Sequence, residues 1–149
     1  MPEPATPVVL GIDFGARRIG LATGNTVTGT ARPLNTIRQT SQTLVDLEGV
    51  VRDWKPGRII VGLPLAADGS ETSMSRAARS FAADLRSRVG EIAMEFQDER
   101  YTSRMADSQF AQARHGGHAR QRDARNLDSV AAAIIVESWL AAQVPNGST

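Results

Sequence analysis

Two hydrophobic patterns divide this chain into segments. Short, nearly continuous apolar runs bounded by glycine, proline or charged residues are typical of buried strands. Apolar residues that recur every three or four positions are typical of helices packed on one face. The runs predict strands over 8–14, 18–23, 33–37, 58–61 and 92–97. The helical spacing predicts helices over 41–54, 73–89, 103 to about 114 and 128–144.

The spacing between the predicted strands decides how they pair. Three residues separate the first two strands, which predicts an antiparallel hairpin. Helices separate the later strands, which predicts right-handed crossovers and parallel pairing. We therefore expect an α/β fold with a mixed five-stranded sheet, made of an antiparallel hairpin and a parallel half and flanked by helices. The first strand would lie at the centre of this sheet.

The length of the chain and its ends predict one domain. A chain of 149 residues suits a single core, so we expect one domain over 1–149. Residues 1–7 include three prolines and residues 145–149 are small and polar apart from proline, which predicts flexible tails. Residues 114–126 hold two glycines and many charges, and they are predicted to form a mobile loop.

Composition narrows the class of protein. Hydrophobic residues make up 41% and charged residues 22% of the chain, as is usual for a soluble globular protein. No apolar run approaches the roughly 20 residues of a membrane helix, and the N-terminus lacks the character of a secretory signal. The lack of cysteine excludes disulfides, thiolate metal sites and a thiol nucleophile. These features favour a cytoplasmic protein that does not bind membranes.

Three carboxylates interrupt or follow the apolar segments. Asp13 lies near the end of the first predicted strand, Glu99 follows the last one, and Asp128 begins the last predicted helix. The carboxyl ends of parallel strands meet at one edge of a sheet, so Asp13 and Glu99 can be neighbours there. The small residues 131–133 would let the last helix approach the sheet and bring Asp128 to the same place. Asp98 is expected to point away from Glu99, because side chains alternate along a strand.

Three carboxylates at one place need a cation, because like charges repel strongly in a low dielectric. Carboxylate oxygens are ligands for Mg²⁺ and Mn²⁺, and two such ions about 4 Å apart support in-line displacement at phosphorus. The chain has no cysteine and no paired-histidine spacing that would favour zinc. The predicted catalytic residues, which are also the predicted ligands of Mg²⁺ or Mn²⁺, are therefore Asp13, Glu99 and Asp128.

Each carboxylate also has a purely structural interpretation. Asp13 could accept hydrogen bonds from the amides of the following turn. Glu99 could form a surface ion pair with Arg100 or Arg104, and Asp128 could be a helix N-cap or first-turn residue. The three together favour a site, because they converge at predicted strand and helix ends.

Arginine supplies nearly all of the positive charge. Lys55 is the only lysine among 17 basic residues, and the net charge is +1. Codon bias would explain this use of arginine, but several arginines also cluster near the predicted site. Such a cluster would bind a polyanion with an affinity that falls as salt is added, although solvated turns and loops are the simpler interpretation. The predicted nucleic-acid-binding residues are Arg17, Arg18, Arg100, Arg104, Arg114, Arg120, Arg122 and Arg125.

Four segments together resemble a known family. They are "GIDFGARRIGLATGN", "IIVGLPLAADGSE", "DERYTSRMAD" and "LDSVAAAIIVESWL", in the right order and spacing over roughly residues 8–140. They resemble the YqgF family of Holliday-junction-resolvase-like proteins, which are also described as pre-16S rRNA nucleases. The resemblance implies an RNase H-like fold and a bacterial cytoplasmic nuclease that trims the 5′ end of precursor 16S ribosomal RNA. It also implies that the acidic positions of the family are Asp13, Glu99 and Asp128 in this sequence.

Departures from the family pattern leave the substrate open. Tyr101 stands where an aliphatic residue is common, the segment before Asp128 carries arginine where lysine is frequent, and "SETSMSRAAR" replaces a more usual glycine-containing continuation. We expect a metal-dependent nuclease acting on structured RNA, with ribosomal precursor particles as a partner. The alternatives are a Holliday junction resolvase acting on branched DNA and a non-catalytic nucleic-acid-binding factor of ribosome assembly. The segment "IDFG" also resembles the phosphate loops of sugar kinases and actin-like ATPases, but those need a second domain, for which 149 residues are too few.

Overall fold

The structure of this chain is a computed structural model that describes residues 6–100 and 124–143. Outside the described residues lie the predicted helix over 103–114, most of the predicted loop over 114–126, most of the predicted tail over 1–7 and all of the predicted tail over 145–149. Thr6 and Pro7, within the first predicted tail, each form a hydrogen bond to the folded part of the chain.

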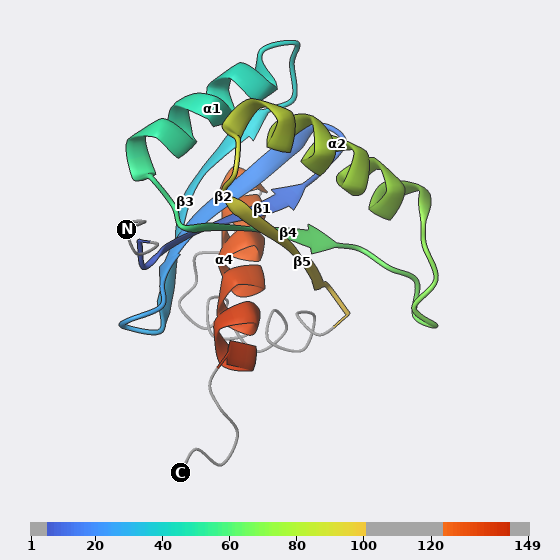
Figure 1. Cartoon of the computed structure of the whole chain (residues 1–149). Coiled ribbons are helices and arrows are strands. Elements are labelled where there is room, and N and C mark those ends of the chain that lie inside the picture. The colour runs from blue at the N-terminus through green and yellow to red at the C-terminus, as the bar shows by residue number, and fades with distance from the viewer. Residues whose placement is uncertain (1–5, 101–123, 144–149) are drawn as a thin grey trace.

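Five strands form one mixed sheet. They are β1 (Val8–Phe14), β2 (Arg18–Asn25), β3 (Thr30–Arg38), β4 (Arg58–Leu63) and β5 (Ala93–Asp98). Their order is β3-β2-β1-β4-β5; β1–β2 and β2–β3 are antiparallel pairs, and β1–β4 and β4–β5 are parallel pairs. The predicted hairpin, the predicted parallel half and the central place of β1 are therefore confirmed (Figure 1).

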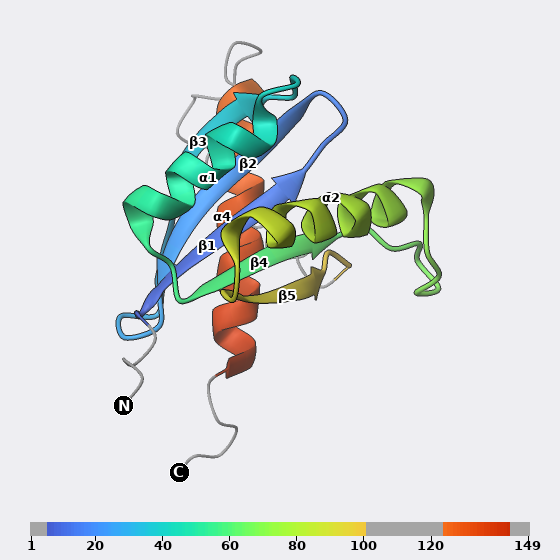
Figure 2. The ribbon, with the colours of Figure 1, turned by 45° about the horizontal axis from the view of Figure 1, so that its top comes forward.

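Helices cover both faces of the sheet. They are α1 (Thr43–Trp54), α2 (Ser73–Val89) and α4 (Ala124–Gln143). α1 and α2 lie side by side on one face, and α4 crosses the other face (Figures 1 and 2). β1 and α2 have the predicted bounds, whereas β3 is longer than predicted because its mostly exposed residues carry little apolar pattern. In the part of the chain that the structure describes, no helix is both long and apolar enough to cross a membrane.

The sheet separates two hydrophobic cores. Leu10 and Ile12 of β1 belong to the core under α1 and α2, which also contains Leu47. Val9 belongs to the core under α4, together with Trp139. Successive side chains of a strand point to opposite faces, so a strand between two helical layers must be apolar at consecutive positions. The prediction that β1 is buried on both faces is therefore confirmed.

Glycines of β1 and β2 let α4 approach the sheet closely. A Cβ atom on Gly11 would lie 2.2 Å from Val136 Cγ2 and 3.1 Å from the main-chain oxygen of Ala132. A Cβ atom on Gly24 would lie 2.4 Å from Val136 Cγ1. Any side chain at these two positions would therefore push α4 away from the sheet. The close approach expected from the small residues of the helix is present, and it depends equally on the glycines of the strands.

Polar contacts fix α4 against the parallel half of the sheet. Trp139 Nε1 donates a hydrogen bond to Glu95 Oε1 at 3.0 Å, and Gln97 Nε2 donates to Ser138 Oγ at 3.1 Å. Arg58 forms an ion pair with Glu95, and its guanidinium carbon lies 5.4 Å from the centroid of the Trp139 ring. These contacts hold the C-terminal half of α4 in place and so help to set where its N-terminal half meets the sheet.

The start of α4 differs from the prediction. The helix begins at Ala124 instead of Asp128, so residues 124–126 are helical and the prediction of a loop through residue 126 is wrong there. The first turn, "ARNL", has no apolar stripe, and a helix end does not need one. Asp128 is the fifth residue of α4, so the interpretation of Asp128 as an N-cap is also wrong.

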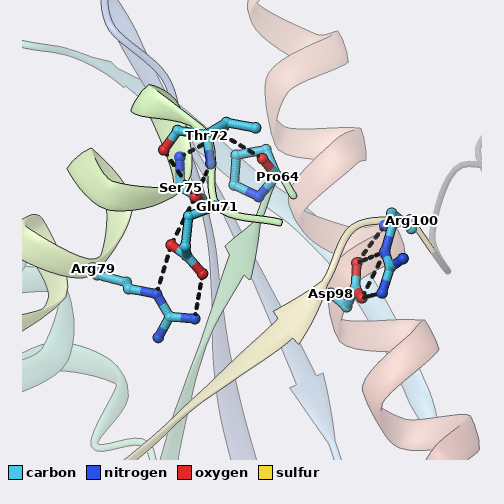
Figure 3. A network of polar contacts seen from close by, with 7 residues as sticks. All are labelled: Pro64, Glu71, Thr72, Ser75, Arg79, Asp98 and Arg100. Atoms are coloured by element: carbon cyan, nitrogen blue, oxygen red, sulfur yellow. Dashed lines mark hydrogen bonds and ion pairs between the residues drawn. The ribbon is translucent and has the colours of Figure 1, made fainter. Parts of the chain in front are cut away.

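A capping box begins α2 after the loop that follows β4. The Ser75 amide donates to Thr72 Oγ1 at 2.9 Å, and the Thr72 amide donates to Ser75 Oγ at 2.7 Å (Figure 3). The Thr72 hydroxyl also donates to the Pro64 carbonyl at 2.8 Å. Beside the cap, both Nε and Nη2 of Arg79 donate to the Glu71 carboxylate at 3.0 Å. Thr72 therefore joins the start of the helix to the segment that leaves β4.

Replacing Thr72 by alanine should lower the free energy of unfolding by about 1–2 kcal/mol, because the helix cap and the bond to Pro64 are both lost. Thr72→Ser should retain most of the stability, since the hydroxyl remains. Urea denaturation followed by circular dichroism measures both values. Ser80→Ala, at an exposed position of the same helix, is the control and should change stability by less than about 0.5 kcal/mol. Equal stability of Thr72→Ala and the parent would contradict the role given to this cap.

Candidate functional site

Asp13 lies near the C-terminal end of β1, on the face that α4 covers, and a glycine stands on each side of it. Gly20 of β2 is its register partner, and Gly62 of β4 directly follows Val61, the last residue of β4 that pairs with β1. A Cβ atom on Gly20 would lie 2.0 Å from the main-chain oxygen of Asp128. A Cβ atom on Gly62 would lie 3.1 Å from Cδ and Oε2 of Glu99. The two missing side chains therefore make the space in which Asp128 and Glu99 approach Asp13 from opposite sides.

The three carboxyl groups are within electrostatic reach of one another. Burial, followed by the charge of Asp128, raises the pKa of Asp13 from 3.8 to about 6. Burial, followed by the charges of Asp13 and Asp98, raises the pKa of Glu99 from 4.5 to about 7. The structure thus brings together the three carboxylates that the sequence analysis placed at one edge of the sheet. Their roles as catalytic residues and metal ligands stay predictions.

Asp128 carries an ion pair with Arg18. The Arg18 Nε donates to Asp128 Oδ2 at 2.7 Å, and both side chains are partly exposed. Arg18 and Gly20 lie two positions apart on β2, so they face the same side of the sheet. The glycine admits the main chain of α4, and the arginine reaches the carboxylate beside it. The sequence analysis placed Arg18 near the site as a phosphate contact, but it did not find this pair, because nothing local in the sequence joins β2 to α4.

The donor set is suited to a hard divalent cation, although the side chains are not arranged around one. Among residues 6–100 and 124–143, no group of three or more His, Cys, Asp or Glu side chains is placed so that it could hold a metal ion. The available donors are carboxylate oxygens, which Mg²⁺ and Mn²⁺ prefer. Burial and neighbouring negative charge raise the pKa values of Asp13 and Glu99, so a nearby cation would favour their ionised forms. Asp13 and Glu99 therefore fit a divalent cation, and Asp128 fits it only if its contact with Arg18 changes.

Asp98 and Arg100 form a second ion pair at the end of β5 (Figure 3). Arg100 donates to Asp98 through Nε at 2.9 Å and through Nη2 at 2.6 Å, and this lowers the pKa of Asp98. Its Nη1 donates to the Ala67 carbonyl at 3.1 Å. Gly69, at a positive φ of 89°, lies against the guanidinium, where a Cβ atom would be 3.3 Å from Nη1. Arg100 therefore joins the end of β5 to the loop after β4, and its predicted contact with nucleic acid stays a prediction.

The structure describes only some of the other predicted nucleic-acid-binding residues. Arg17 is exposed in the hairpin turn between β1 and β2. Arg125 lies in the first turn of α4, and only its backbone is described. Outside the described residues lie Arg104, Arg114, Arg120 and Arg122. The structure therefore places positive charge beside Asp13 but describes only part of the predicted basic segment.

The architecture defines a class of fold. The solved structure of Thermus thermophilus RuvC in complex with a Holliday junction substrate is similar over 91% of this chain and 96% of that chain, with a TM-score of 0.58 and 14% sequence identity. At this identity the likeness shows the fold alone. The chain has the RNase H-like fold of RuvC-type resolvases, as the sequence analysis predicted.

Sequence comparison then gives the family. A relative from Xylella fastidiosa (strain M23), named "Putative pre-16S rRNA nuclease", is 41% identical over 148 residues, which cover 95% of this chain and 94% of the relative. A protein of the same name from Histophilus somni (strain 2336) is 39% identical over 133 residues, covering 88% and 92%. The family model RuvX, described as Holliday junction resolvase, matches residues 7–142. This chain belongs to the RuvX family, which confirms the resemblance noted in its sequence.

Replacing Gly20 by alanine should destabilise the protein by about 3 kcal/mol, because the added methyl group overlaps the main chain of α4, which cannot move without unpacking a core. Gly49→Ala is the matched control. A Cβ atom at Gly49, within α1, would meet nothing within 4 Å, so this change should be neutral or stabilise by about 0.5–1 kcal/mol. Thermal and urea denaturation of both variants measure the difference. Similar stabilities would show that α4 does not depend on Gly20.

Stability should fall with rising pH because of Asp13 and Glu99. In the folded state the pKa of Asp13 is raised to about 6 and that of Glu99 to about 7. The folded protein therefore retains protons at pH values where the unfolded chain has lost them. Relative to the double variant Asp13→Asn/Glu99→Gln, the parent should lose about 1–3 kcal/mol between about pH 4.5 and pH 7.5. Urea denaturation at several pH values, without divalent cations, gives this difference. Glu91→Gln, at an exposed position before β5, is the control. Parallel curves for the parent and the double variant would contradict the raised pKa values of these two carboxyl groups.

Proposed function

We propose that this protein is a divalent-metal-dependent nuclease that hydrolyses phosphodiester bonds and processes the 5′ end of precursor 16S ribosomal RNA. The observation that carries the proposal is the convergence of Asp13, Glu99 and Asp128 at the carboxyl edge of the parallel half-sheet. The names of the relatives and of the family, which are those of nucleases, support the same conclusion. A role on ribosomal RNA agrees with the expected cytoplasmic location and with ribosomal precursor particles as a partner.

Asp13 and Glu99 would hold Mg²⁺ or Mn²⁺, and Asp128 would join them. A bound divalent cation supplies an activated water at neutral pH and stabilises the leaving oxygen of the phosphodiester. The protein itself contributes the acidic oxygens: Asp13 lies on β1, Glu99 follows β5 on the far side of β4, and Asp128 lies on a helix packed against glycines. The positive charge of the bound cation would lower the pKa values of Asp13 and Glu99 and keep both side chains ionised at neutral pH.

Arginines would bind and orient the nucleic acid. Arg17 and Arg18 lie in and after the hairpin turn next to Asp13, where a guanidinium can contact a phosphate through two parallel hydrogen bonds. The remaining predicted contacts are Arg100, Arg104, Arg114, Arg120, Arg122 and Arg125. Because these contacts are to phosphates, affinity should fall as salt concentration rises.

Branched DNA is the second candidate substrate. It is favoured by the description of the family model as Holliday junction resolvase and by the likeness of the fold to a RuvC bound to a Holliday junction substrate. A third interpretation, a nucleic-acid-binding factor of ribosome assembly without turnover, predicts that the carboxylates serve only the fold. The electrostatic cost of placing three carboxylates together supports an active site over that interpretation.

A cleavage assay with Asp13→Asn tests the proposal. The parent should cut an RNA carrying the precursor 16S 5′ leader only when Mg²⁺ or Mn²⁺ is present. Asp13→Asn should cut at least about 100-fold more slowly, since even residues that only support a metal ligand change activity by about 10- to 100-fold. RNA binding should survive, because the arginines are unchanged. Asp53→Asn, at an exposed position of α1, is the matched control and should cut like the parent.

The same preparation should be given a four-way DNA junction. Cleavage of the junction but not of the RNA would show that branched DNA is the substrate. Binding of RNA without metal-dependent cleavage, and unaffected by Asp13→Asn, would show that the protein is a binding factor. Either result would overturn the proposed activity on precursor ribosomal RNA.

A further inference from the structure

The three carboxylates of the site differ in what compensates their charge. Asp13 and Glu99 have raised pKa values because burial and neighbouring negative charge oppose their ionisation. Asp128 instead accepts a hydrogen bond from the Arg18 guanidinium, with 2.7 Å between Nε and Oδ2. One residue of the predicted ligand set is thus engaged by a cationic side chain of the protein itself.

Arg18 and a divalent cation would compete for Asp128. The guanidinium that donates to a carboxylate oxygen places a positive charge next to that oxygen. A divalent cation at the same oxygen would be repelled by this charge. The side chain of Arg18 is 39% exposed and that of Asp128 is 30% exposed, so the ion pair borders solvent and neither partner is sealed in the core. Ion pairs of this kind contribute little free energy, which lets a cation replace the arginine.

Arg18 is also placed to use its guanidinium elsewhere. It is the first residue of β2 and follows the exposed hairpin turn beside Asp13. The planar set of donors with which a guanidinium binds a carboxylate also fits a phosphate, so a guanidinium released from one can bind the other. The nearest predicted location of a scissile phosphate is at Asp13, on the neighbouring strand.

We propose that Arg18 is a positioning residue that exchanges partners, holding Asp128 when no cation is bound and contacting a substrate phosphate once a divalent cation has taken Asp128. This inference rests on the proposed function. It makes the binding of cation and nucleic acid cooperative, because each would favour the state in which Arg18 has left Asp128. By thermodynamic linkage, the cation and the nucleic acid raise the affinity for each other by the same factor.

Titration with Mn²⁺ in the absence of nucleic acid tests the exchange. Electron paramagnetic resonance of free Mn²⁺ gives the affinity without any turnover. Arg18→Gln should bind Mn²⁺ more tightly than the parent, by up to about fivefold, because removal of an ion pair worth up to about 1 kcal/mol releases Asp128. At saturating Mn²⁺, kcat/KM for RNA should nevertheless fall, and Arg18→Lys should partly restore it because the positive charge is kept.

Arg88→Gln is the matched control. Arg88 Nη1 lies 2.6 Å from Glu48 Oε1, with side chains 41% and 30% exposed, so this pair between α2 and α1 is nearly identical in length and exposure. Arg88→Gln should leave the Mn²⁺ affinity unchanged. In the Asp128→Asn background, Arg18→Gln should no longer raise the affinity, since the carboxylate for which it competes is gone. Thermal melting of each variant confirms that it is folded before titration.

The outcomes separate this inference from the proposed function. If the parent binds Mn²⁺ and cuts RNA but Arg18→Gln binds Mn²⁺ no more tightly, the exchange is wrong and the nuclease stands. If Arg18→Gln gains the same affinity with and without Asp128, the arginine acts only as a distant repelling charge, and the exchange is again wrong. If neither parent nor variant binds Mn²⁺, the proposed function and the exchange both fail.

Discussion

Contact between the main chain of α4 and the sheet is the constraint on which the site depends. Asp128, Ala132 and Val136 are spaced four residues apart, so they form one face of the helix. Gly20 lies under the first of them, and Gly11 lies under the other two. Side chains at these glycines would push the helix away from the sheet and would carry Asp128 away from Asp13. The same packing builds the second core, so the stability of the fold and the geometry of the site have one cause.

Electrostatic repulsion is the cost of this geometry. Asp13 lies between Gly20 and Gly62 on the neighbouring strands. Asp128 and Glu99 fill the space that the two glycines leave, and they bring negative charge toward Asp13. Burial and like charge then raise the pKa values of Asp13 and Glu99, while Arg18 compensates Asp128. An arrangement that destabilises ionised carboxylates in the folded protein is hard to explain by packing alone. It is readily explained if a cation binds there, because the free energy lost in the cation-free protein is regained on binding.

The fold was largely predictable because its signals are local. The continuous apolar run of β1 predicted a strand covered on both faces, and the short turn after Phe14 predicted the hairpin. Helical spacing predicted α2 to the residue, since its apolar stripe runs along its whole length. The start of α4 was placed four residues late because its first turn is polar. Asp13 and Glu99 were predicted as neighbours from a general rule about parallel strands, which needs only the order of the elements.

The sequence by itself determined which segments are strands and helices, which faces of them are apolar, and which acidic residues stand at strand ends. Each of these follows from residues close together in the chain. Only the tertiary structure decided that Gly20 and Gly62 make room for two of the carboxylates, that Arg18 holds Asp128, and that Arg100 pairs with Asp98 at the end of β5. Most of these contacts join different elements, and they depend on the register between strands and on the line along which α4 crosses the sheet. Register and crossing are fixed by the packing of both cores together, and no local pattern of residues encodes them.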